Sequence, residues 1–139
     1  MLKNSSEHGL SLLPAHTLSA IQIDLTHVQH NYRVLQQFLK DSGSMQTRCG
    51  GVVKANAYGV GAIPVVKTLY EVGCRDFFVA DCDEALRIRS YVPEGRIFVF
   101  SGLMAHTAPL FIENDFIPTL LHKEQVLYWQ REAQRLKRK

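Results

Sequence analysis

Apolar residues along the chain follow two periodicities in turn, a short β-like run and then a longer helical pattern. Short apolar runs predict five strands, over residues 20–25, 50–55, 77–80, 96–100 and 117–121. After each run, apolar positions recur at helical spacing and predict five helices, over residues 26–39, 62–72, 83–90, 106–113 and 123–139. The pattern therefore predicts β–α units that repeat at roughly 25-residue spacing.

Several residues are suited to begin or end these helices. Thr26 is a good N-cap for the first helix. Pro64 falls in the first turn of the second helix, and Gly73 follows its last turn. Asp81 and Asp83 follow a strand, where an active site could lie, but capping of the next helix is the favoured interpretation. The apolar face predicted for the first helix consists of Val28, Tyr32, Leu35 and Leu39.

Strands that alternate with helices predict an α/β fold with a parallel sheet and right-handed crossovers. An open doubly wound sheet and a (β/α)₈ barrel share this pattern, and the pattern alone does not choose between them. Five units would make only a partial barrel of the TIM type. With 139 residues the chain has room for one domain. We assign residues 1–19 to an N-terminal arm and residues 20–139 to a truncated barrel domain.

Composition narrows the class of protein further. The chain is 46% hydrophobic and 21% charged, which is ordinary for a globular domain. No apolar run approaches the ~20 residues needed to cross a bilayer. The first 20 residues lack the continuous apolar region of a secretory signal, so we predict a cytoplasmic protein. Three cysteines without CxxC spacing indicate reduced thiols and predict neither a disulfide framework nor a zinc site.

The net charge of +3 comes from one end of the chain. Residues 131–139 contain five basic residues and one acidic residue, a net of +4, which leaves −1 for the other 130 residues. Cations are favourable at the carboxyl end of a helix, so a solvated helix end explains this segment. A nucleic-acid interface would need basic residues spread over a folded surface, and none is predicted.

The segment with the most chemical information is VVKANAYGVG, residues 52–61. Lys54 lies at the carboxyl end of an apolar strand, where parallel α/β folds place their active sites. An apolar wall there favours the free amine that a Schiff base requires. Tyr58 and the start of the next helix, with unpaired N–H groups, would suit a phosphate. Taken alone, Lys54 could instead be a solvated charge and Tyr58 a packing residue.

This segment resembles the cofactor-lysine signature of alanine racemases, with eight consecutive matches in VVKANAYG. Related barrels, such as amino-acid decarboxylases and small cofactor carriers, share a lysine at a strand end but lack the Asn-Ala-Tyr-Gly continuation. The resemblance extends over about residues 20–125, with further matches over residues 23–25, 30–32, 78–80, 84–89, 97–100 and 118–120.

The resemblance implies a pyridoxal-phosphate-dependent isomerase of fold type III that interconverts L-alanine and D-alanine, the latter for cell-wall peptidoglycan. It assigns Lys54 two roles, cofactor attachment and proton transfer. It assigns Tyr58 a contact with the cofactor phosphate, and Phe100 a place in the wall of the cofactor pocket. It implies no metal. The family usually has histidine where this chain has Val60, a change in local polarity rather than in mechanism.

Other parts of the family's machinery have no counterpart in this sequence. The resemblance implies two arginines from later strands, further phosphate ligands, and a β-domain tyrosine that acts as the second base across a homodimer interface. Racemisation needs a base on each face of the substrate, and Lys54 serves one face. We therefore expect an N-terminal fragment that is inactive alone. The alternatives are a non-catalytic remnant that binds pyridoxal phosphate and one half of a split racemase.

Histidines outside the motif are weaker candidates for chemistry. His27 and His30 are three residues apart on a predicted helix, a spacing that could face a metal, but no third ligand is nearby in sequence. Two surface histidines are the favoured interpretation. His106 and His122 precede predicted helices and suit caps or loops.

Overall fold

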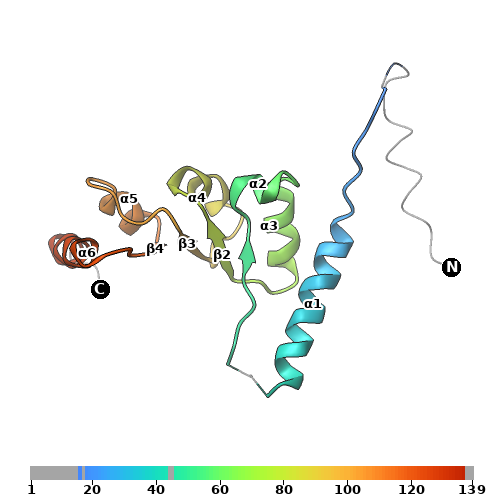
Figure 1. Ribbon diagram of the computed structural model, residues 1–139, viewed down its shortest axis with the longest axis horizontal. Helices are drawn as coiled ribbons and strands as arrows, with labels where there is room; N and C mark the ends of the chain where they lie inside the picture. The colour runs from blue at the N-terminus through green and yellow to red at the C-terminus, as the bar shows by residue number, and fades with distance from the viewer. Residues whose placement is uncertain (1–15, 17, 44–45, 137–139) are drawn as a thin grey trace.

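The computed structural model describes residues 16, 18–43 and 46–136, and from residue 51 onward each strand is followed by a helix, as the sequence predicts (Figure 1). The elements are α1 (Leu25–Asp41), β1 (Gly51–Val52), α2 (Lys54–Tyr58), α3 (Ala62–Glu71), β2 (Asp76–Val79), α4 (Cys82–Arg89), β3 (Arg96–Val99), α5 (Ala108–Glu113), β4 (Phe116–Pro118) and α6 (Lys123–Arg135). Most of the proposed N-terminal arm lies outside the described residues. In the described part of the chain, no helix has the length and apolar character needed to span a membrane.

The strands form one parallel sheet in the unbroken order β1-β2-β3-β4. A doubly wound sheet reverses its strand order at a switch point, whereas a barrel adds each new strand beside the last. The order therefore decides between the two architectures that the sequence left open, and the sheet is part of a barrel wall. Because all strands are parallel, their carboxyl ends share one edge of the sheet.

The strand predicted over residues 20–25 is wrong. Residues 20–24 have no regular structure, and Leu25 already begins α1. In Figure 1 the chain before α1 runs away from the sheet, and Ile21 is 91% exposed. An alternating sequence becomes a strand only when a neighbouring strand accepts its hydrogen bonds and covers its apolar face. Among the described residues, the outer edge of β1 has no such neighbour, so four strands replace the expected five.

The cap of α1 also differs from the prediction. The carboxylate of Asp24, not the hydroxyl of Thr26, caps the helix, because Asp24 Oδ1 accepts the Thr26 N–H at 2.9 Å. The Thr26 hydroxyl donates to the same oxygen at 2.6 Å. These two hydrogen bonds, that of the side chain above all, hold the pKa of Asp24 below its usual value. Aspartate is as good an N-cap as serine and better than threonine, which agrees with the choice.

The core lies between the sheet and the helices that connect its strands. Alternate residues of β2 and β3 are fully buried on this side, namely Phe77, Val79, Ile97 and Val99. They share one cluster with Val66 of α3 and Ile88 of α4. Their neighbours Phe78 and Phe98 point to the other side and are half-buried. The sheet thus has a fully buried helix side and a second side of stacked aromatic rings.

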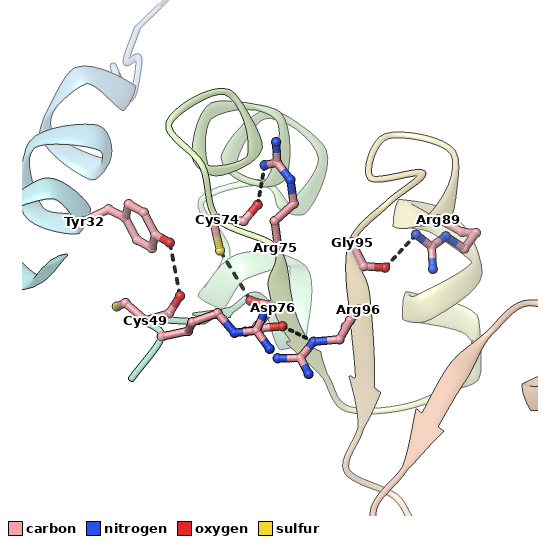
Figure 2. Close-up of polar contacts among 9 residues, drawn as sticks. Tyr32, Cys49, Cys74, Arg75, Asp76, Arg89, Gly95 and Arg96 are labelled. Carbon is pink, nitrogen blue, oxygen red and sulfur yellow. Dashed lines mark hydrogen bonds and ion pairs between the residues drawn. The ribbon is translucent and has the colours of Figure 1, made fainter. Parts of the chain in front are cut away.

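Helix α1 packs against α3 through part of its predicted apolar face (Figure 1). Tyr32 is buried, and its hydroxyl donates to the carbonyl oxygen of Cys49 at 3.1 Å (Figure 2). Val28 packs against the core. Leu35, predicted to be buried with them, is half exposed because the contact follows a narrow stripe centred on Tyr32.

An ion-pair cluster ties the amino ends of β2 and β3 together. Asp76 is buried, and its carboxylate binds Arg96 Nε at 2.5 Å and Arg48 Nε at 3.5 Å (Figure 2 shows the Arg96 contact). The hydrogen bond to Asp76 raises the pKa of Arg96 above its usual value. In barrels, residues at the amino edge serve stability rather than catalysis.

We therefore expect Asp76→Asn to lower the free energy of unfolding by about 1–3 kcal/mol, because it removes a charged hydrogen bond while both arginines remain partly solvated. Urea unfolding followed by circular dichroism measures the change. Glu113→Gln, an exposed acidic residue on α5, is the control and should change stability by less than about 0.5 kcal/mol. Equal effects of the two substitutions would contradict a structural role for Asp76.

Candidate active site

Lys54 and Phe100 meet at the carboxyl edge of the sheet. Lys54 follows β1 with only Val53 between them, and Phe100 directly follows β3. The register pairs Val52 with Phe78 and Phe78 with Phe98. If this register is continued by two residues, Lys54 lies beside Ala80 at the end of the next strand, and Ala80 lies beside Phe100. Lys54 Nζ lies 6.0 Å from the centre of the Phe100 ring.

Three phenylalanines form an aromatic wall next to Lys54. The Phe78 ring stacks on Phe98 with a centroid distance of 4.6 Å, and on Phe100 with a centroid distance of 5.6 Å. Phe100 keeps 39% of its surface exposed. This wall lies on the side of the sheet opposite the helices, and it leaves a flat apolar surface within reach of the lysine amine.

Residues 55–58 form a left-handed helical turn directly after Lys54. Ala55, Asn56, Ala57 and Tyr58 have φ between 51 and 54° although none of them is glycine. The left-handed conformation costs non-glycine residues about 1–2 kcal/mol each. Such strain persists only where surrounding contacts over-determine the backbone, and it gathers at functional sites. The turn is therefore held by the rest of the fold.

Tyr58 ends this turn, and its side chain is 65% exposed. The structure thus brings together two of the three predicted site residues, Lys54 and Phe100, while Tyr58 is exposed four residues after Lys54. A contact between Tyr58 and a phosphate remains a prediction.

The start of α3 offers fewer free N–H groups than were expected for a phosphate. The Ala62 N–H donates to Asn56 Oδ1 at 2.9 Å. Pro64 has no N–H, and the Val65 N–H donates to the carbonyl oxygen of Gly61 at 3.3 Å. The left-handed turn brings the Asn56 side chain to the helix start, where it satisfies a donor that a ligand would otherwise bind.

Glu84 is the residue that sequence reasoning missed. Its Oε1 accepts the Ala55 N–H at 2.6 Å, and its Oε2 accepts the Ala80 N–H at 2.8 Å. The available signal was the spacing Asp-x-x-Glu at the start of α4, which matches the sequence pattern of a capping box. Asp81 fills the cap position as predicted, since its Oδ1 accepts the Glu84 N–H at 3.0 Å. One carboxylate therefore joins the residue after Lys54 to the end of β2.

The remaining polar candidates lie apart from this site. His27 and His30 are exposed on α1. His106 lies in a turn with φ of 70°, and His122 occupies the N-cap position of α6 without capping it through its side chain. In the described ranges, no group of three histidine, cysteine, aspartate or glutamate residues is placed to hold a metal ion.

The three cysteines are free thiols. Burial raises the pKa of each thiol above its usual value, and Asp81 and Asp83 add to the effect at Cys82. Cys74 is fully buried and donates to the carbonyl oxygen of Asp76 at 3.3 Å (Figure 2). A raised pKa leaves less of the reactive thiolate at neutral pH, so these residues serve packing rather than nucleophilic chemistry.

A parallel sheet in barrel order, with a lysine at its carboxyl edge and an aromatic wall beside it, defines this chain as part of a (β/α) barrel with an active-site edge. Residues 23–139 match the family model "Alanine racemase, N-terminal domain". The chain belongs to the alanine racemase family through this domain.

Curated relatives and solved structures agree with this assignment. The chain is 41% identical over 109 residues to a biosynthetic alanine racemase of Agrobacterium fabrum, and 37% identical over 108 residues to an alanine racemase of Rhizobium meliloti. Each match covers 78% of this chain and 27% of the relative. The chain thus spans about a quarter of the length of these relatives.

Two crystal structures share the fold. An alanine racemase from Bartonella henselae with covalently bound pyridoxal phosphate superposes with a TM-score of 0.76 at 36% identity, covering 84% of this chain and 32% of that protein. An alanine racemase from E. faecalis superposes with a TM-score of 0.71 at 29% identity, covering 79% and 29%. Both support the partial barrel described above.

Proposed function

We propose that this chain is the part of an alanine racemase that carries the cofactor lysine, and that Lys54 holds pyridoxal phosphate. The observation that carries the proposal is the position of the Lys54 amine, 6.0 Å from the Phe100 ring at the carboxyl edge of the sheet. The Bartonella henselae relative holds its pyridoxal phosphate covalently, which agrees with an amine as the attachment point.

The residues at this edge fit such a cofactor. Lys54 supplies a half-buried primary amine, the group that reacts with an aldehyde. Phe100 and Phe78 supply a flat apolar wall suited to an aromatic ring. Tyr58, exposed at the end of the turn that follows Lys54, would supply a hydroxyl for the phosphate. This set accounts for the aldehyde, ring and phosphate of the cofactor without a metal.

Pyridoxal phosphate, when bound, withdraws electrons from the Cα–H bond of an amino acid. Lys54 would take up or return the Cα proton through Nζ on one face of the substrate. The aromatic wall would exclude water beside that atom. The other face of the substrate needs a second base, which we place outside these 139 residues. As in the complete enzymes, we propose a homodimer, with alanine as the substrate. We propose that residues 20–139 form the domain that holds the cofactor and supplies the base on the first face.

Borohydride trapping tests the proposal. The 139-residue chain mixed with pyridoxal phosphate should develop a visible absorption band, and reduction should fix the label on Lys54. Lys54→Ala should lower the label on the peptide that contains residue 54 by at least about tenfold, because the amine is the attachment point. Peptide mapping by mass spectrometry measures the label.

Lys67→Ala is the matched control. Lys67 is an exposed lysine on α3 whose amine lies 4.6 Å from the Tyr91 ring, so it also sits beside an aromatic ring but away from the sheet edge. Its replacement should leave the label on Lys54 unchanged. A label spread evenly over surface lysines would show that Lys54 is not the attachment site of the cofactor.

A further inference from the structure

The Glu84 carboxylate accepts two backbone N–H groups from separate segments of the sheet edge. Ala55, 29 residues earlier in the chain, donates at 2.6 Å, and Ala80 donates at 2.8 Å. Ala55 directly follows Lys54, and Ala80 directly follows the neighbouring strand β2. The two oxygens of one side chain therefore join the strand ends that flank the amine.

These contacts are not those of an ordinary capping box. In that motif the glutamate at the third helical position returns to the N–H of the cap residue. Here the cap residue is Asp81, and both Glu84 oxygens are instead occupied by Ala55 and Ala80. Asp81 holds Glu84 in turn, since its carboxylate accepts the Glu84 N–H. Asp81 thus anchors Glu84, and Glu84 binds the backbone at the carboxyl edge of the sheet.

The contact with Ala55 falls where the backbone is strained. Ala55 is the first residue of the left-handed turn, with φ of 51°. Hydrogen bonds to a carboxylate are shorter and stronger than those between neutral groups. A bond of this kind at the first strained residue opposes relaxation of the turn to a right-handed conformation. Such relaxation would re-aim the side chain of Lys54, one residue earlier.

We propose that Glu84 is a positioning residue for Lys54, which acts through the Ala55 N–H and keeps the amine over the strand end beside Phe100. It does not touch the reacting atoms. The proposal rests on the proposed function, since it is the attachment of pyridoxal phosphate at Lys54 that the position serves.

The first measurement needs no cofactor. In the ¹⁵N-labelled chain, Glu84→Ala should speed hydrogen exchange of the Ala55 and Ala80 amides together, by at least about tenfold, because both lose their acceptor. Glu84→Gln keeps the shape but only one good acceptor oxygen, so it should expose one of the two amides. Asp83→Ala is the control: Asp83 is an exposed acid in the same first turn of α4, and its loss should leave both amides protected.

The second measurement is the borohydride label at Lys54. Glu84→Ala should lower it severalfold, Glu84→Gln should lower it less, and Asp83→Ala should not change it. Thermal melting of each variant shows whether it folds. If Glu84→Ala does not fold, the comparison is made with Glu84→Gln. Unchanged labelling in a folded Glu84 variant would overturn the positioning role and leave the proposed function intact. Absence of selective labelling in the unsubstituted chain would overturn the proposed function and this inference with it.

Discussion

Replacement of Phe77 by alanine should lower the free energy of unfolding by about 3–5 kcal/mol. Phe77 is fully buried in β2, and β2 pairs with β1 on one side and β3 on the other. Truncation of a buried phenylalanine to alanine costs about 3–5 kcal/mol, because the removed ring leaves a cavity. Even complete domains have a net stability of only about 5–15 kcal/mol. A single ring therefore represents a large share of the stability available to this chain.

Urea unfolding measures this effect, with Trp129 fluorescence as the reporter. The ring centres of Trp129 and Phe111 are 6.3 Å apart, and Trp129 packs against the core. Its fluorescence emission therefore follows the loss of packing. Phe38→Ala is the matched control, since Phe38 is 68% exposed on α1 and its loss should change stability by less than about 0.5 kcal/mol. Similar midpoints for the two variants would show that the packed core described above does not hold the chain together.

The 139-residue chain should also self-associate in solution. Among the described residues, β1 pairs only with β2 and β4 pairs only with β3, so the sheet has two open edges. An open edge presents unpaired N–H and C=O groups to any other strand. Val52 in β1 is 43% exposed, and Leu121 beyond β4 is 61% exposed, so apolar side chains accompany both edges. We expect a concentration-dependent increase in mass by sedimentation velocity.

Val52→Lys tests the role of the β1 edge. A lysine on an edge strand opposes strand addition, so we expect association to weaken by about tenfold, or 1.4 kcal/mol. Leu86→Lys on α4 is the control, because Leu86 is similarly exposed but lies on a helix. A monodisperse monomer with one sharp thermal transition would contradict the open-edge account. It would indicate a self-sufficient small α/β sheet.

Local signals were enough for several elements. Helix α3 begins near Pro64 and ends before Gly73, as predicted, because both residues act through their own backbone geometry. Its buried residues Val65, Val66 and Leu69 follow the helical period. The same reasoning failed over residues 20–25. There the alternating pattern was correct for a strand, but the partner that a strand requires is absent from the described sheet.

The candidate site also contains one residue that local sequence identifies and one that it does not. Lys54 could be found because one continuous segment, residues 52–61, carries both the strand end and the motif. Glu84 could not be assigned its role, because its partner Ala55 is 29 residues away and donates a backbone N–H that every residue except proline possesses. Nothing in the identity of Ala55 marks it as a partner.

By itself, the sequence determined the alternation of strands and helices from residue 51 onward, the buried face of α3 and the place of the lysine after a strand. These features depend on periodicity, capping and backbone preference within a few residues. Only the tertiary structure decided the unbroken strand order, the left-handed turn after Lys54 and the carboxylate of Glu84 that holds it. Those features depend on hydrogen bonds between segments distant in sequence, which the local preference for a right-handed backbone does not predict.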